Sequence, residues 1–197
     1  MQRGNFSNRA EHNNRPYVDN IILIGLMGAG KTTIGKLLAN SMGKIFIDSD
    51  HEIQRRTGVD IPLIFEFEGE AGFRKREVEV LQDVARLSNI VLATGGGAVL
   101  REENRELLRK SGTVIYLRVP VNELKRRTRF DKNRPLLQTA NPQARLVELF
   151  NQRDPLYQQT AHIILDSGRQ SVRVLVQTLI KKLEAYHLSR PIMPSND

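Results

Sequence analysis

Short apolar runs alternate with longer amphipathic segments from residue 21 onward. The apolar runs predict five strands, at residues 21–24, 45–47, 90–93, 113–117 and 162–165. The segments between and after them predict helices at 31–42, 51–57, 61–67, 71–88, 101–110, 120–129, 142–151 and 170–186. Strands that alternate with helices are typical of an α/β fold, in which right-handed crossovers join the strands of a parallel sheet.

The length of the chain, 197 residues with 40% hydrophobic content, suits one such domain, which we place at residues 20–186. Residues 1–19 are rich in Asn and Arg and predict a disordered or weakly attached extension, and residues 187–197 predict a C-terminal tail. The chain has no cysteine, which excludes disulfides and thiolate metal sites. It also lacks an apolar run typical of a signal peptide or a membrane span, so we expect a soluble, cytoplasmic protein.

The segment from Gly25 to Thr32 fits the pattern G-x-x-x-x-G-K-[ST] and lies between the first strand and the first helix. Its glycines let backbone N–H groups turn toward a polyphosphate, Lys31 adds a mobile cation, and the hydroxyl of Thr32 is a Mg²⁺ ligand. The dipole of the helix that follows favours the same anion. We therefore predict a nucleotide-binding phosphate loop.

Two carboxylates, Asp48 and Asp50, follow the second predicted strand. Parallel sheets bind ligands at the carboxyl ends of their strands, so both are expected to face the phosphate loop. If the segment stays extended, the two side chains point to the same side, one toward Mg²⁺ and the other toward an acceptor hydroxyl. The structural alternative is that Asp50 only caps a helix.

Three consecutive glycines, Gly95 to Gly97, follow the third predicted strand. They leave no β-carbon where the backbone approaches a ligand, and their N–H groups can donate to a hydroxyl or a carboxylate. A glycine run is also typical of an ordinary flexible turn, so this signal is weak by itself.

The formal net charge of +8 comes largely from residues 101–135, where Lys and Arg outnumber Asp and Glu. A basic segment suits the phosphates of a nucleic acid or of a small nucleotide, and charge does not separate the two. The neighbouring phosphate loop favours the small nucleotide.

Six motifs together resemble the shikimate kinase family: GLMGAGKTTIGK, IDSD, FEGEAGFRKRE, ATGGGAV, KNRPLL and RDPLY, in this order along approximately residues 20–185. The resemblance implies a P-loop kinase fold, with a five-stranded parallel sheet between two layers of helices and a mobile lid at residues 130–141. It implies transfer of the γ-phosphoryl group of ATP to the 3-hydroxyl of shikimate, with Mg²⁺ as cofactor, in the route to chorismate and the aromatic amino acids. It also implies a monomer that binds ATP, ADP and shikimate, and no nucleic acid or membrane.

The resemblance assigns the shikimate carboxylate to Arg74 and Arg153 with the segment Gly95, Gly96 and Gly97, and the reacting hydroxyls to Asp50. A planar guanidinium suits a carboxylate better than an ammonium does, although an isolated arginine is more often a surface charge. Glu77, one helical turn after Arg74, is expected to hold that guanidinium. Phe65 and Phe73 are expected either to wall the ring of the substrate or to belong to the core.

For the nucleotide, the resemblance assigns Lys31 to the β- and γ-phosphates, Thr32 and Asp48 to the magnesium ion, and Arg134, on the lid, to the phosphates of the closed state. Arg127 matches the position that stacks on adenine, with compensation of a helix dipole as the alternative. The catalytic set is Lys31, Asp50 and Arg134. The nucleotide-binding set is Gly28, Ala29, Gly30, Lys31, Thr32, Thr33, Arg127 and Arg134.

Two other classes of function stay open at this stage. A gluconate-type or nucleoside-monophosphate kinase has the same loop, although Gly-Phe-Arg and Arg-x-Pro-Leu-Tyr argue against both. A noncatalytic ligand sensor or nucleic-acid-binding protein with this fold is disfavoured by the presence of Lys31, Asp48, Asp50 and Arg134.

Overall fold

The computed structural model describes residues 19–129 and 135–189. Within these ranges five strands form one parallel sheet in the order β2-β3-β1-β4-β5. The strands are β1 (Asn20–Ile24), β2 (Ile45–Asp48), β3 (Ile90–Ala93), β4 (Gly112–Arg118) and β5 (Ile163–Asp166). Each lies within two residues of its predicted position. The central strands β1, β3 and β4 are continuous apolar runs because they are buried on both faces.

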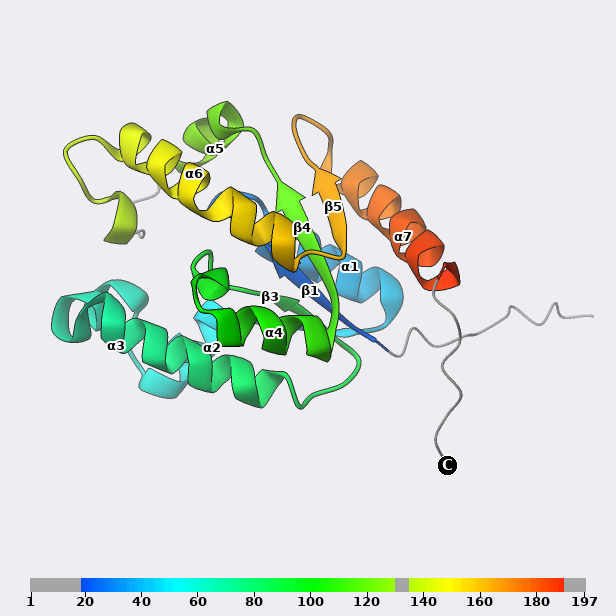
Figure 1. The fold of residues 1–197 in the computed structure, drawn as a ribbon, viewed down its shortest axis with the longest axis horizontal. Coiled ribbons are helices and arrows are strands. Elements are labelled where there is room, and N and C mark those ends of the chain that lie inside the picture. Colours follow the sequence, from blue (N-terminus) through cyan, green and yellow to red (C-terminus); the bar gives the residue numbers. More distant parts are fainter. Residues whose placement is uncertain (1–18, 130–134, 190–197) are drawn as a thin grey trace, which may run out of the picture.

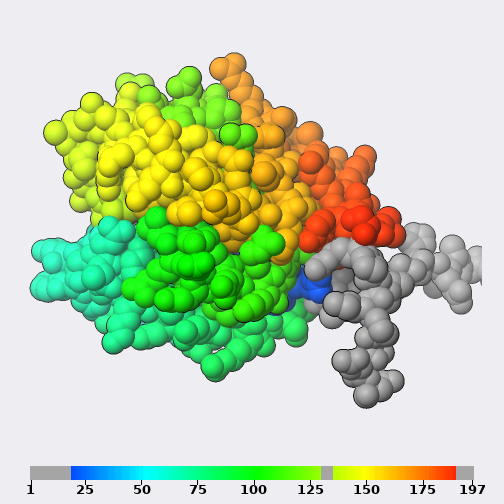
Figure 2. Space-filling view, viewed as in Figure 1, coloured from blue at the N-terminus to red at the C-terminus, as the bar shows by residue number. Residues whose placement is uncertain are grey.

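Helices cover both faces of the sheet, as predicted. Figure 1 shows α1 behind the strands and α4 and α6 in front of them, and α7 packs against α1. The helices are α1 (Lys31–Met42), α2 (Ser49–Thr57), α3 (Ile61–Val84), α4 (Glu102–Ser111), α5 (Val121–Thr128), α6 (Pro142–Thr160) and α7 (Val172–Leu188), with short 3-10 helices η1 (Ala98–Leu100) and η2 (Pro135–Leu137). On the surface in Figure 2, α6 lies beside α4 although the two helices are far apart in sequence.

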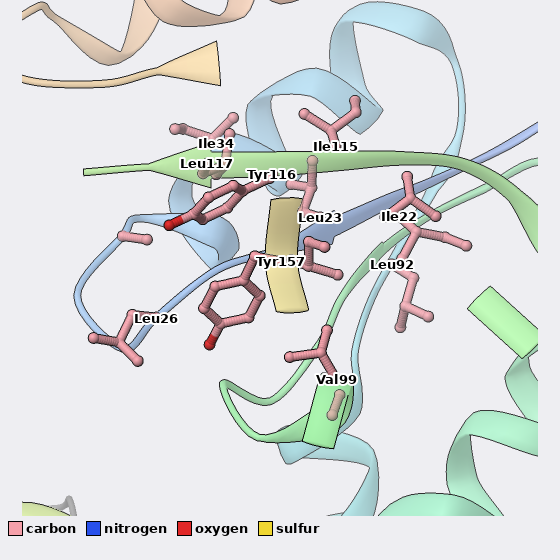
Figure 3. Close-up of a cluster of buried hydrophobic side chains, with 14 of the residues drawn as sticks. Ile22, Leu23, Leu26, Ile34, Leu92, Val99, Ile115, Tyr116, Leu117 and Tyr157 are labelled. Atoms are coloured by element: carbon pink, nitrogen blue, oxygen red, sulfur yellow. The ribbon is translucent and has the colours of Figure 1, made fainter. Parts of the chain in front are cut away.

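The core lies on both sides of the central strand β1, whose five residues are all buried. Figure 3 shows Ile22 and Leu23 of this strand among apolar side chains from β3, β4 and α6. Fixing β1 in this way fixes the carboxyl edge of the sheet, from which the loops that carry the candidate residues emerge.

Three helix predictions need correction. The break expected between the helices at 61–67 and 71–88 is confirmed, because Gly69 inside α3 has a non-helical backbone with φ of 67° and ψ of −175°, but the second helix ends at Val84 rather than at residue 88. The helix expected at 142–151 continues to Thr160 because α6 accommodates Pro155 in its interior. The helix expected at 51–57 begins at Ser49, directly after β2.

No helix in the described ranges is long and apolar enough to cross a membrane. The predicted extension lies almost wholly outside the described residues, as do the end of the predicted tail and residues 130–134 of the predicted lid. The rest of that lid region contains η2 and the start of α6.

Candidate active site

The loop from Gly25 to Gly30 connects β1 to α1 and has a backbone that only glycine adopts easily. Gly25, Gly28 and Gly30 have φ values of 144°, 79° and 93°. The Nζ of Lys31 donates to the carbonyl oxygens of Gly25, at 2.7 Å, and Leu26, at 3.1 Å. The ammonium therefore lies over the loop, at the N-terminus of a 12-residue helix, where an anion is favoured.

The hydroxyl of Thr32 donates to Oδ2 of Asp48, at 2.7 Å. Asp48 is also the N-cap of α2, because its Oδ1 accepts from the backbone N–H groups of Asp50 and His51. The expectation that residues 48–50 stay extended is wrong, as is the alternative that Asp50 is the cap. Asp50 instead lies in the first turn of α2, and both carboxylates still line the same cavity.

Arg74 is held between two carboxylates of its own helix. Its Nη1 donates to Oε2 of Glu77, at 2.8 Å, and its Nη2 donates to Oε1 of Glu70, at 2.9 Å. The pairing with Glu77 confirms the prediction, whereas Glu70 was missed. Together they orient the guanidinium against Gly97, where an added β-carbon would overlap it.

Glu77 is fully buried, and this burial raises the pKa of its carboxyl group, while Arg74 opposes the rise. Its Oε1 and the Oδ1 of Asp50 lie 2.6 Å and 2.7 Å from the position that a β-carbon on Gly95 would occupy. The absence of a side chain at Gly95 therefore lets two carboxylates approach the glycine segment together.

Arg153, on α6, is only 2% exposed. Its Nε and Nη1 atoms are buried and have no hydrogen-bond partner within the described part of the chain. Burial lowers the pKa of this guanidinium, and the positive charge of Arg74 adds to the effect. A buried cation with unused donors is costly unless an anion binds it.

Arg127, at the other end of the cavity, donates through Nη2 to the carbonyl oxygen of Gly168, at 2.7 Å, and through Nη1 to that of Gly28, at 3.3 Å. It thereby connects the phosphate loop to the loop after β5. In that second loop, Gln170 accepts from the N–H of Gly168. Gln170 and Ser167 line the cavity, and no sequence pattern singled them out.

One cavity of about 500 Å³ connects these groups at the carboxyl edge of the sheet. Phe65 and Phe73 lie in its wall with ring centroids 4.9 Å apart, so both partly belong to the core and partly face the cavity. Arg134 lies outside the described residues. Every other candidate residue lines the cavity: Gly28, Ala29, Gly30, Lys31, Thr32, Thr33, Asp48, Asp50, Arg74, Gly95, Gly96, Gly97, Arg127 and Arg153.

A family model described as shikimate kinase matches residues 27–184. The chain belongs to the shikimate kinase family. It is 68% identical over 183 residues to a shikimate kinase of Nitrosomonas europaea, an alignment that covers 93% of this chain and 87% of that protein. It is 59% identical to a shikimate kinase of Nitrosospira multiformis over 89% of this chain and 90% of that protein.

Solved structures place the fold in the same family. A shikimate kinase from Acinetobacter baumannii in complex with shikimate superimposes with a TM-score of 0.86 and 48% identity, over 88% of this chain and 97% of that chain. A gluconokinase from Sinorhizobium meliloti superimposes with a TM-score of 0.54 at 16% identity, over 89% of this chain and all of that one. This second similarity shows only the P-loop kinase fold.

Proposed function

We propose that this chain transfers the γ-phosphoryl group of ATP to the 3-hydroxyl of shikimate, giving shikimate 3-phosphate and ADP in the route to chorismate and the aromatic amino acids. Membership of the shikimate kinase family supports this reaction. The observation that carries it for this chain is the buried pair Arg74 and Arg153 in one cavity with the phosphate loop. The unused Nε and Nη1 donors of Arg153 can bind the carboxylate of a small anionic acceptor, and the phosphate loop can bind a nucleotide.

The proposed nucleotide site consists of the loop Gly28–Thr33 and Arg127. Backbone N–H groups and the helix dipole hold the β- and γ-phosphates, and Lys31 exchanges its two carbonyl acceptors for phosphate oxygens. Because its ammonium already lies at the loop, this exchange needs only a small movement. Lys31 then opposes the charge that develops on the transferred group. Arg127 covers the adenine.

The proposed magnesium site consists of Thr32 and Asp48. No group of three or more His, Asp or Glu side chains that could hold a metal exists among the described residues, so an all-protein cage is absent there. A hydroxyl and a carboxylate 2.7 Å apart beside a phosphate loop nevertheless fit Mg²⁺, which keeps several waters and takes its other oxygens from the nucleotide. When bound, Mg²⁺ supplies neutralisation of phosphate charge.

In the proposed shikimate site, Arg74, Arg153 and the segment Gly95–Gly97 bind the carboxylate. Asp50 accepts a hydrogen bond from the 3-hydroxyl and orients it toward the γ-phosphate. In a loose transition state the proton leaves late, so orientation is the main contribution of this carboxylate. Arg134 and closure of a lid over residues 130–141 stay predictions.

The first test of this function is ADP formation by the purified protein with Mg²⁺ and ATP, in parallel with shikimate, gluconate, AMP or no acceptor. We expect saturable turnover with shikimate alone, because only this acceptor combines a carboxylate for the two arginines with ring hydroxyls for Asp50. Turnover with gluconate or AMP would reassign the acceptor. A folded, ATP-binding protein without acceptor-dependent turnover would support a sensor, and salt-dependent DNA binding would then be measured.

The glycine segment gives a second prediction. Gly97→Ala is expected to raise the KM for shikimate by about tenfold or more, because the new β-carbon overlaps the guanidinium of Arg74, which Glu70 and Glu77 prevent from moving aside. Gly96→Ala is the steric comparison within the same segment, and we expect a smaller rise, since no heavy atom lies closer than 3.5 Å to its added β-carbon. Equal KM values for the two variants would show that Arg74 does not depend on Gly97.

A monomeric state, a cytoplasmic location and the absence of nucleic-acid binding stay predictions. Elution volume at several protein concentrations tests the first of these.

A further inference from the structure

Two tyrosines, Tyr116 of β4 and Tyr157 of α6, form a buried pair behind the cavity. Each side chain is 1% exposed, and their ring centroids lie 4.9 Å apart. Figure 3 shows the rings one above the other, with both hydroxyl groups directed to the same side. Burial raises the pKa of both phenols, so each hydroxyl keeps its proton and acts as a donor.

The two hydroxyls have different acceptors. Tyr116 donates to Oδ1 of Asp154, at 2.7 Å, and thus connects β4 to α6. Tyr157 donates to the carbonyl oxygen of Gly96 and thus connects α6 to the glycine segment. Only the second bond reaches a residue that lines the cavity.

The carbonyl of Gly96 and the N–H of Gly97 belong to one planar trans peptide unit, in which the two groups point in opposite directions. A donor that fixes the carbonyl therefore also fixes the N–H, which points away from Tyr157. The N–H of Gly97 has no acceptor within the described residues, whereas the carbonyl oxygens of Gly95 and Gly97 accept from the N–H groups of Ala98 and Leu100. The carbonyl of Gly96 is thus the one of the three glycine carbonyls that accepts from a side chain, whereas the other two accept from backbone N–H groups.

We propose that Tyr157 is a positioning residue for the acceptor: its hydroxyl orients the peptide between Gly96 and Gly97 so that the N–H of Gly97 donates to the carboxylate of shikimate. The inference rests on the proposed function, because it assigns the carboxylate to the glycine segment. Glycine has the widest backbone freedom of all residues, so this peptide needs an external contact to keep one orientation. A hydrogen bond to the carbonyl also polarises the N–H and strengthens it as a donor to an anion.

Tyr157 also contributes to the core, and Tyr116 separates that contribution from positioning. Both phenols are buried in the same ring pair, and both variants Tyr157→Phe and Tyr116→Phe remove one hydroxyl that donates a hydrogen bond, although Oδ1 of Asp154 keeps Nε of Arg118, at 3.4 Å. A purely structural role predicts a lower melting temperature in either variant, without a selective loss of shikimate affinity in one of them. A positioning role predicts a loss of shikimate affinity in Tyr157→Phe alone.

The experiment measures the KM for shikimate, the KM for ATP, kcat and the melting temperature in the wild type and both variants. Tyr157→Phe is expected to raise the KM for shikimate by about threefold to tenfold, with kcat and the KM for ATP within about twofold of the wild type. Tyr116→Phe is expected to leave all three kinetic values within about twofold. A rise of equal size in both variants, or none in folded Tyr157→Phe, overturns the proposal.

The wild type provides a second test that does not depend on a variant folding. Saturating shikimate without nucleotide is expected to slow hydrogen exchange at the amide of Gly97 in NMR spectra by at least about tenfold. Exchange that stays unchanged overturns the proposal. Shikimate-dependent turnover of the same wild-type sample separates this outcome from a failure of the proposed function.

Discussion

Asp50→Asn is expected to lower kcat by about two to four orders of magnitude, which is the largest effect that we predict. The substitution keeps the size of the side chain but removes the negative charge that orients the acceptor hydroxyl and stabilises its proton as phosphoryl transfer proceeds. The KM values for shikimate and ATP are expected to change much less, since neither the carboxylate site nor the phosphate loop contains Asp50. The loss therefore belongs to the transition state.

The fold offers a reason why this variant should stay intact. Asp48, not Asp50, caps α2, so the helix keeps its first-turn hydrogen bonds when residue 50 becomes an amide. Asp60→Asn is a matched control, because Asp60 caps α3 and lies outside the cavity wall. Initial rates at saturating ATP and shikimate, with circular dichroism of each variant, complete the measurement. A folded Asp50→Asn protein with unchanged kcat would remove Asp50 from the mechanism.

The sequence predicts the sheet well because its three central strands, β1, β3 and β4, are buried on both faces and are therefore continuous apolar runs. The segments Ile21–Ile24 and Ile90–Ala93 are examples. The phosphate loop could also be predicted, since its glycines adopt positive φ and Lys31 donates to carbonyl oxygens only five and six residues away. These features depend on neighbours in sequence, which is where pattern analysis is strongest.

The helix predictions fail where tertiary contacts override a local signal. A proline usually ends a helix, yet α6 continues past Pro155 because Asp154 and Tyr157 on either side of it are anchored to Tyr116 and Gly96. The break expected between residues 67 and 71, in contrast, is confirmed, because the backbone of Gly69 is non-helical. Burial of the second half of α6 therefore overrides the local signal at Pro155, whereas the local signal of Gly69 holds.

In the candidate site, too, contacts between neighbours in sequence could be predicted, and contacts between distant segments could not. Arg74 and Arg153 are far apart in sequence, and only the resemblance to a family indicated that they act together. The pairing of Arg74 with Glu70 could have been found from the i, i+4 spacing within α3. The hydrogen bond from Tyr157 to Gly96 could not, because no local pattern connects the end of β3 to the middle of α6.

Arg153→Ala is expected to raise the KM for shikimate by about two orders of magnitude and to change ATP affinity by less than about threefold. A buried guanidinium that binds a carboxylate contributes about 2–5 kcal/mol, and its loss leaves the anion with Arg74 and the glycine segment. The melting temperature is expected to stay the same or rise, since the variant removes a buried charge whose Nε and Nη1 have no partner in the described structure. An unchanged or higher melting temperature distinguishes a binding residue, whose buried charge costs stability for the sake of function, from a structural one.

Arg145→Ala is the matched control on the same helix, because Arg145 is paired with Glu148 on the surface side of α6, at 2.8 Å, and does not line the cavity. Titration calorimetry with shikimate and with ATP, each alone, measures the two affinities separately. If Arg153→Ala weakened both ligands equally, the side chain would be supporting α6 rather than binding the acceptor. Arg153→Lys refines the answer: an ammonium keeps the charge but not the planar pair of donors, so we expect only partial recovery of shikimate affinity.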